Sequence, residues 1–209
     1  SLSFIKNFRE ITIIYFGNIF KSNIQNENDG SLLLASLDKY LPALKEVLSD
    51  VDSQQMLLQE SFQKNFINLI TRPQYRNNKS FLLKISEFLS VFGEGVLPIS
   101  SSQIIGFMLL FDDENIIRSA IHLCSKYRSS YLSYLGIIQD VYNNEISKEN
   151  ISFPVIIDFL KFAPFVVEKR KLDILNAINA AIAKYSEKYI TKQDKEILSD
   201  FIFYAFESL

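Results

Sequence analysis

The single histidine and the single cysteine of this chain, His122 and Cys124, lie two positions apart in the stretch IHLCSKY. An imidazole and a thiolate together form the base and nucleophile of many hydrolases, and both groups bind zinc. On a helix, however, residues two apart point about 200° apart around the axis, so these two side chains cannot share a pocket. We therefore expect Cys124 to pack in the core, and His122, together with Arg118, to face solvent or a neighbouring helix.

A second group with catalytic potential is the run of carboxylates formed by Asp112, Asp113 and Glu114. Neighbouring carboxylates act as general acid and base only where a pocket shifts one pKa strongly. This run stands at the expected start of a helix, where the helix dipole favours negative charge, and we interpret it as a helix N-terminus. The chain also lacks a Gly-rich phosphate loop and a G-x-S-x-G elbow, so the sequence predicts no enzyme, no metal site and no cofactor.

Basic residues surround a tyrosine in RPQYRNNK, a stretch without acidic residues that we expect to be a loop. The residues concerned are Arg72, Tyr75, Arg76 and Lys79. Cations with an interleaved aromatic ring suit phosphate binding and base stacking, and they also suit an acidic peptide. We predict that these four residues bind a partner, with solvated loop charge as the alternative.

The last segment, DFIFYAFESL, is rich in aromatic residues. It has more apolar circumference than one core-facing stripe of a helix requires. Such a helix is either buried between layers or covered by a partner. Phe203 and Phe206 are therefore predicted contact residues, for another protein or for self-association with a second copy of the chain.

The elements that must position these residues are helices. Apolar residues recur every three or four positions almost throughout, and sustained alternation with a period of two is absent. Only 6 Gly and 5 Pro interrupt 209 residues, too few for a sandwich or barrel with frequent turns. We predict an all-α protein of about ten antiparallel helices.

Three local signals mark the boundaries of individual helices. Pro42 predicts a kink or a break, because it lacks an N–H and crowds the preceding turn. Asp52 and Gln55 have the spacing of a capping box and predict the start of one long helix. Thr191 and Asp194 predict the start of the last helix in the same way.

Three helical stretches carry a resemblance to a known architecture: NKSFLLKISEFLSVFG, DENIIRSAIHLCSKY and SSYLSYLGIIQDVY. They resemble the inner helices of armadillo and HEAT repeats, in which helix pairs recur about every 40 residues. The resemblance is architectural and covers about residues 30–145. It implies an irregular solenoid, whereas the local signals alone also allow a closed helical bundle.

Composition limits the remaining classes. With 48% hydrophobic and 22% charged residues, we expect one all-helical domain over 1–209. The net charge of −2 argues against nucleic acid as a partner. Even the most apolar run, SFPVIIDFLKFAPFVV, contains Asp158 and Lys161, so no membrane insertion is expected. One cysteine fits a reducing cytoplasmic or nuclear compartment, and a start at Ser1 without methionine leads us to expect a fragment of a longer protein.

Together these observations predict a non-catalytic module that binds other proteins. It would be a helical-repeat scaffold or regulatory domain that binds a GTPase, a cytoskeletal protein or a chromosomal partner. The alternative is a nucleic-acid-binding helical array that uses the basic loop 72–79, with binding that weakens steeply as salt rises. A third hypothesis is an all-helical enzyme that uses Asp112 and Asp113.

Overall fold

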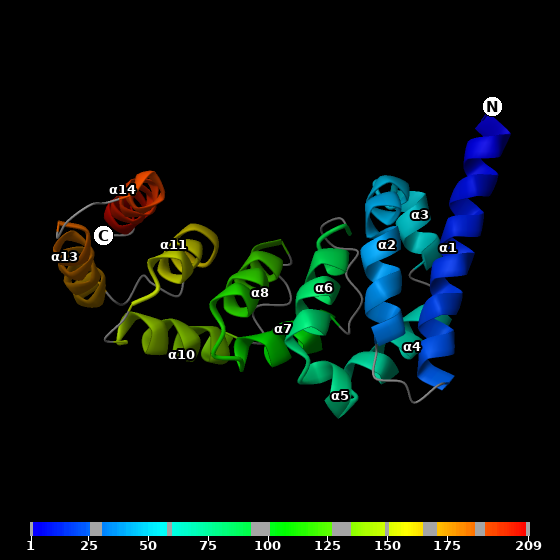
Figure 1. Cartoon of the computed structure of the whole chain (residues 1–209), viewed down its shortest axis with the longest axis horizontal. Helices are drawn as coiled ribbons and strands as arrows, with labels where there is room; N and C mark the ends of the chain where they lie inside the picture. Colours follow the sequence, from blue (N-terminus) through cyan, green and yellow to red (C-terminus); the bar gives the residue numbers. More distant parts are fainter. Residues whose placement is uncertain are drawn as a thin grey trace. The chain divides into compact units, whose positions relative to one another are not determined.

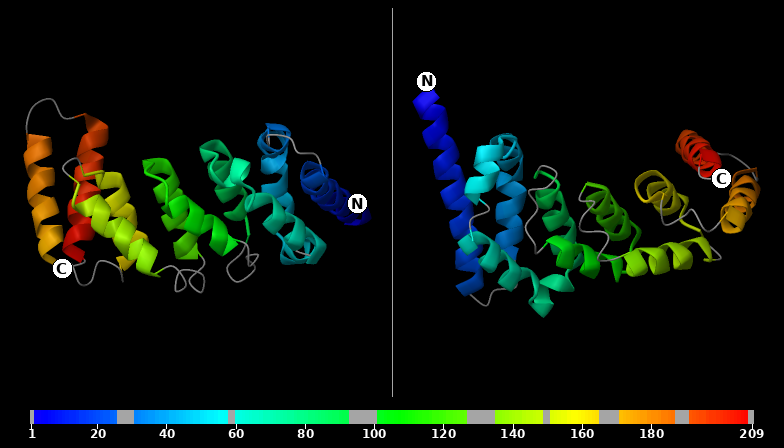
Figure 2. Two further views of the ribbon diagram at one scale, coloured as in Figure 1. Left: turned by 90° about the horizontal axis from the view of Figure 1, so that it is seen from below. Right: turned by 180° about the vertical axis from the view of Figure 1, so that it is seen from behind.

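The computed structural model describes residues 2–25, 31–57, 60–92, 101–126, 135–148, 151–164, 171–186 and 191–207. Within these ranges the chain forms twelve helices and no strand (Figure 1, Figure 2). The prediction of an all-α protein is confirmed. The chain separates into two compact units, unit 1 (Ser1–Met108) and unit 2 (Leu109–Leu209). That the whole of 1–209 forms a single domain stays a prediction.

Unit 1 is organised around its first helix. Its helices are α1 (Leu2–Gln25), α2 (Ser31–Val47), α3 (Val51–Leu57), α4 (Glu60–Ile70), α5 (Pro73–Arg76), α6 (Lys79–Leu89) and α7 (Ser101–Leu109), which ends at the first residue of unit 2. The α1 helix packs against α2, α3 and α4 (Figure 1). On the opposite side from α1, α2 also packs against α6.

The core of unit 1 contains a cluster of phenylalanine rings around Phe88 of α6. The centroid of the Phe88 ring lies 5.5 Å from that of Phe16 on α1 and 6.1 Å from that of Phe66 on α4. Phe81, Ile85 and Phe88 follow one another at spacings of three and four, which places them on one buried face of α6. Burial of each such side chain contributes roughly 2 kcal/mol, so this face holds α6 in the core of unit 1, where Phe88 meets α1 and α4 and Phe81 meets Tyr75 of α5.

Unit 2 consists of two layers of helices. It contains α8 (Glu114–Lys126), α10 (Leu135–Ile146), α11 (Phe153–Phe162), α13 (Lys171–Ser186) and α14 (Lys192–Glu207). The α11 helix lies between α8 and α14, and we call this layer the α8–α11–α14 row (Figure 1, Figure 2). In the other layer, α10 packs on α11, and α13 packs on α10 and α14.

Aromatic rings join α11 to its neighbours in the core of unit 2. The ring of Phe159 meets that of Tyr142 on α10, with centroids 5.3 Å apart. The ring of Phe153, one and a half turns earlier, lies 5.0 Å from Phe201 on α14. Both α11 rings are buried, so the apolar side of α11 faces inward and its polar side is left for the surface of the row.

The start of α3 differs from the prediction. Asp50, not Asp52, is the capping residue: its carboxylate accepts hydrogen bonds from the backbone N–H (3.1 Å) and the hydroxyl (2.9 Å) of Ser53. The single long helix predicted from Asp52 onward is present as α3 and α4, on either side of residues 58–59. The sequence offers several side chains that can cap here, and only the backbone conformation selects one of them.

Two other boundary predictions have opposite outcomes. The possibility that Pro42 breaks its helix is excluded, because α2 runs without interruption through this residue. The predicted start of α14 is confirmed, since Thr191 and Asp194 cap each other: each backbone N–H donates to the other side chain at 3.1 Å. The described residues form twelve helices where about ten were predicted, because α3 and α4 are two elements and α5 forms inside the expected loop.

Candidate interaction surface

The α8 helix divides its polar and apolar residues between two faces, as its spacing predicts. Cys124 is buried in the core of unit 2, and burial raises the pKa of its thiol to about 12. A thiol with such a pKa stays protonated at neutral pH and is a poor nucleophile. Arg118 and His122, one turn apart, point toward α11 instead. The prediction that Cys124 packs in the core is confirmed, and of the two surroundings expected for His122 and Arg118, solvent or a neighbouring helix, both apply: the two side chains meet α11 and stay 51% and 38% exposed.

Arg118 and His122 converge on Asp158 of α11. Arg118 Nε donates a hydrogen bond of 2.7 Å to Asp158 Oδ2, and His122 Nε2 lies 3.3 Å from the same oxygen. The Asp158 side chain is only 7% exposed. Burial raises the pKa of Asp158, but the hydrogen bonds from His122 and Arg118 outweigh it and hold this pKa below its ordinary value. A charged contact therefore fixes α8 to α11.

A series of aromatic and cationic side chains continues from His122 across the row. The ring of His122 meets that of Phe162 edge-on, with centroids 4.5 Å apart. Lys161 Nζ lies 5.2 Å from the centroid of the Phe162 ring and 5.7 Å from that of Tyr204 on α14. The rings of Tyr204 and Phe203 are 5.2 Å apart. We call these five residues, His122, Phe162, Lys161, Tyr204 and Phe203, the aromatic–cation strip.

The aromatic–cation strip is accessible to solvent. The side chain of His122 is 51% exposed, and Lys161 and Phe203 are exposed as well. Phe162 and Tyr204 are half-buried, so their rings are held in place by neighbours and still reach the surface. Aromatic side chains that are pre-positioned in this way contribute a large share of the binding energy at protein interfaces.

The aromatic segment of α14 is divided between the core and the surface. Phe201 and Ala205, one turn apart, are buried. Phe203 and Phe206, on another side of the helix, are 59% and 61% exposed. Both alternatives that the sequence leaves open, burial and exposure to a partner, thus apply to different residues of one helix. That Phe203 and Phe206 contact a partner stays a prediction.

Sequence reasoning did not identify Asp158, Lys161 or Phe162 as members of a site. A signal for the two charged residues existed, because both interrupt the most apolar stretch of the chain. A charge in such a stretch must either reach the surface or meet a partner inside the protein. Lys161 reaches the surface, and Asp158 meets Arg118 inside the protein.

The predicted role of Tyr75 is wrong. Its side chain is fully buried in unit 1, where the ring lies 4.9 Å from that of Phe81. The expected loop contains α5, which Pro73 opens in a position that suits proline, and this helical turn directs Tyr75 into the core. The ring is therefore not available to a partner, and the base stacking that the nucleic-acid alternative would use has lost its aromatic residue.

The three cations of the same stretch remain at or near the surface of unit 1. Arg76 and Lys79 are exposed, and Arg72 is half-buried. The guanidinium group of Arg76 lies 6.0 Å from the centroid of the Phe107 ring, at the outer limit of a cation–π contact. A role of Arg72, Arg76 and Lys79 in partner binding stays a prediction.

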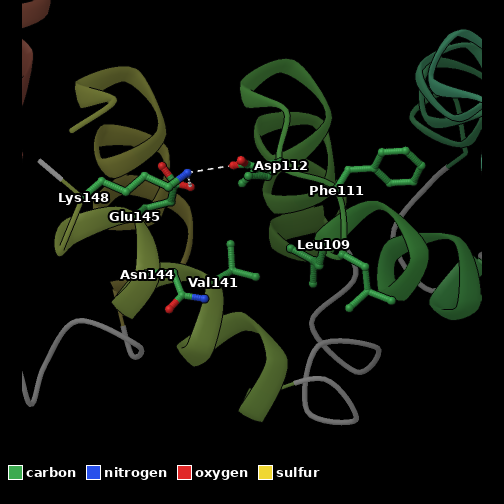
Figure 3. Close-up of a pocket in the computed structure, with 9 residues that line it drawn as sticks. Leu109, Phe111, Asp112, Val141, Asn144, Glu145 and Lys148 are labelled. Atoms are coloured by element: carbon green, nitrogen blue, oxygen red, sulfur yellow. Dashed lines mark hydrogen bonds and ion pairs between the residues drawn. The ribbon is translucent and has the colours of Figure 1, made fainter. Parts of the chain in front are cut away.

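An open cavity of about 410 Å³ lies in unit 2 beside the start of α8 (Figure 3). Its walls combine apolar and charged side chains: Leu109, Leu110, Phe111, Asp112, Ile117, Val141, Asn144, Glu145 and Lys148. Lys148 Nζ donates to Asp112 at 2.8 Å and also to Glu145, and these hydrogen bonds raise the pKa of Lys148 (Figure 3). This bridge ties the end of α10 to the segment that precedes α8.

The two aspartates proposed for acid–base catalysis have other roles at this cavity. The Asp112 side chain is 89% exposed and paired with Lys148, so it is not desolvated as a catalytic carboxylate would be. Asp113 accepts hydrogen bonds from the backbone N–H groups of Asn115 (3.1 Å) and Ile116 (3.2 Å), which confirms its interpretation as a helix cap. Among the described residues, no group of His, Cys, Asp or Glu side chains is arranged to hold a metal ion.

Comparison of the chain with protein-family models, with curated proteins and with solved structures gives no match. Each helix in the described part of the chain is too short or too polar to span a bilayer. No relative therefore indicates a function, and a proposal must rest on the surfaces of the chain itself.

Proposed function

We propose that this chain is a protein-binding module without chemistry of its own, and that its partner binds along the α8–α11–α14 row. The observation that carries the proposal is the aromatic–cation strip, in which centroid distances of 4.5 to 5.7 Å join exposed and half-buried side chains of three helices into one surface. Exposed rings leave water when a partner covers them, and this burial stabilises a complex. Such a continuous surface suits a partner that lies across several helices.

The spacing of the row supports a helical-repeat architecture. The α8 helix begins at residue 114, α11 at 153 and α14 at 192, so successive starts are 39 residues apart. Armadillo and HEAT repeats recur about every 40 residues, and stacked repeats create extended binding surfaces. We infer an irregular armadillo/HEAT-like repeat in unit 2, with α8, α11 and α14 as its inner helices. A scaffold or regulatory domain for a GTPase, a cytoskeletal protein or a chromosomal partner, in the cytoplasm or nucleus, would use such an architecture.

Affinity capture from cell extract, with the whole chain as bait, tests this proposal when two double variants are compared. Phe203→Asp with Phe206→Asp places two charges on exposed positions of α14, and we expect the captured partner to fall by about tenfold or more. Leu172→Asp with Leu175→Asp is the matched control, because these α13 side chains are 70% and 43% exposed in the other layer. Circular dichroism verifies that both variants keep their helices.

Two results would contradict the proposal. One is equal capture by the parent chain and the α14 variant. The other is loss of the partner in the α13 control alone, which would place the binding surface on the other layer. If the partner that is lost is a second copy of the chain, sedimentation of the purified protein will show a dimer, and self-association through α14 is then the interaction.

A further inference from the structure

We propose that the aromatic–cation strip recognises an acidic peptide segment in which a bulky apolar side chain lies within one helical turn of a carboxylate. This inference rests on the proposed function and specifies the chemistry of the partner. The first reason is the position of Lys161. Its ammonium group lies against the rings of Phe162 and Tyr204, and no carboxylate of the described residues is within 4.0 Å of it. A cation held by ring faces keeps its charge available to a carboxylate from outside.

Two other lysines of the chain are placed differently, whereas Lys39 of α2 resembles Lys161 in lying 5.3 Å from the centroid of a ring, that of Tyr40. Lys84 in unit 1 and Lys148 in unit 2 each bridge two carboxylates, so their charge is compensated within the protein. Their hydrogen bonds to carboxylates raise the pKa of both ammonium groups. A partner that approached either lysine would have to displace an existing ion pair, whereas at Lys161 it would add one.

Within the described part of the strip, Lys161 is the cation with no carboxylate within 4.0 Å. At the α8 end, Arg118 is paired with the buried Asp158 and also lies 3.9 Å from Glu114. A lysine that the described residues leave without a carboxylate partner, and that lies among rings, suits a single carboxylate. A single-stranded nucleic acid needs a series of cations along its phosphates, although its bases would also stack on rings. The distribution of charge therefore favours an acidic peptide.

The apolar part of the partner is set by the rings of α14. Phe203 and Phe206 lie one turn apart and expose more than half of their surface. The ring of Tyr204 contacts Phe203 on one side and lies 5.7 Å from Lys161 Nζ on the other. An apolar side chain that covers these phenylalanines therefore brings the neighbouring turn of its own helix close to Lys161. A partner helix with Asp or Glu one turn from Leu or Phe satisfies both contacts.

The test begins with selection of binders from a displayed library of random peptides on the whole chain. We expect enriched peptides to carry Asp or Glu within one turn of Leu, Phe or another bulky apolar residue. A synthetic copy of one enriched peptide is then titrated against purified variants. Lys161→Glu should weaken binding by about tenfold or more, and Lys161→Met, which keeps the aliphatic stem, by less. Lys192→Glu is the matched control, because Lys192 is 93% exposed at the start of α14 and should leave binding unchanged.

The possible failures are distinguishable. Enriched peptides without acidic residues, whose binding the Phe203→Asp, Phe206→Asp variant abolishes, would overturn the carboxylate inference and leave the proposed function standing. Binding of polyuridylate RNA that is lost in Lys161→Glu, without enrichment of any peptide, would overturn it in favour of nucleic acid. If neither peptides nor RNA bind, or if enriched peptides bind every variant equally, both the inference and the proposed surface are wrong.

Discussion

Each unit contains an ion pair that joins two of its own helices. The two pairs have similar N–O distances, but their carboxylates differ in burial. In unit 1, Lys84 of α6 lies 2.6 Å from Asp38 of α2, whose side chain is 63% exposed. In unit 2, Arg118 of α8 lies 2.7 Å from Asp158 of α11, whose side chain is 7% exposed. Water screens the first pair, whereas the second carboxylate is largely removed from water and depends on its partners. Burial, more than distance, decides which of these contacts is needed to hold two helices together.

The units also expose different apolar surfaces. In unit 1, α1 carries four exposed apolar residues, Phe8, Ile11, Ile14 and Tyr15, with exposed fractions between 50% and 66%. In unit 2, the exposed ring of Phe203 belongs to a strip that includes Lys161. A cation also lies beside this face of unit 1, because Lys39 Nζ is 5.3 Å from the centroid of the Tyr40 ring, which meets the ring of Tyr15 edge-on. The α1 face differs in the aliphatic side chains of Ile11 and Ile14, which attract apolar surfaces without discriminating between partners by charge.

Among the ion pairs, the largest effect is expected from breaking the pair that contains the buried Asp158. Asp158→Ala should lower the free energy of unfolding of unit 2 by about 2 kcal/mol, because it removes the buried carboxylate that Arg118 and His122 share and with it a contact between α8 and α11. Asp38→Ala should cost under about 0.5 kcal/mol in unit 1, because the Asp38 carboxylate is exposed and Lys84 keeps Glu87 as a second partner. Hydrogen exchange in denaturant, followed on peptides from α8 and α6, reads the two units separately. Equal costs for the two substitutions would remove the distinction between the pairs.

A smaller loss in the free energy of unfolding of unit 2 is expected at low pH. Because the pKa of Asp158 in the folded state lies below its ordinary value, the stabilisation by the ionised carboxylate is complete above about pH 4 and is lost as pH falls through the folded-state pKa. The free energy of unfolding of unit 2 should therefore decrease as pH falls below about 4, the ordinary pKa of an aspartate, and Asp158→Asn should flatten this part of the profile. Denaturant titrations at several pH values measure this free energy of unfolding in the parent chain and in the variant.

The matched control for the acid profile lies in unit 1. A hydrogen bond from Lys45 lowers the pKa of Glu87, so Glu87→Gln should flatten the acid profile of unit 1 and leave that of unit 2 unchanged. A profile of unit 2 that Asp158→Asn does not alter would contradict the role assigned to the buried pair.

The smallest effect is expected at the exposed apolar faces. Ile11→Ser in α1 and Phe203→Ser in α14 should each change the free energy of unfolding by less than about 0.5 kcal/mol, because both side chains are more than half exposed. Phe201→Ser, two positions away from Phe203 and fully buried, should destabilise clearly and serves as the internal contrast. Urea titrations followed by circular dichroism compare the free energies of unfolding of the three variants. A large loss in Phe203→Ser would mean that the ring is needed by the fold and is not free for a partner.

Much of the fold and part of the site could be predicted from the sequence. The periodicity of α8 separates Cys124 from His122, and the spacing of Thr191 and Asp194 marks the start of α14. The capping role of Asp113 follows from its place before an apolar-periodic segment. These predictions succeed because they depend on geometry within one or two turns of a helix.

The predictions that failed depend on contacts with other helices. Tyr75 was placed in a loop with basic neighbours, but its ring packs on Phe81 in the core. Asp52 has good capping spacing, yet Asp50 is the residue that caps α3. Lys161 and Tyr204 are far apart in sequence, and only the packing of α11 against α14 brings them together.

The sequence by itself determined that the chain is all-α, which stripe of α8 is buried and where its last helix begins, because hydrogen bonds and side-chain contacts within a helix act over three or four residues. The tertiary structure alone decided that Arg118 and His122 meet Asp158, 40 positions from Arg118, and that a lysine on α11 lies between rings of two helices. Such contacts depend on which helix faces lie against each other, and that arrangement is set by burial of apolar surface across the whole unit.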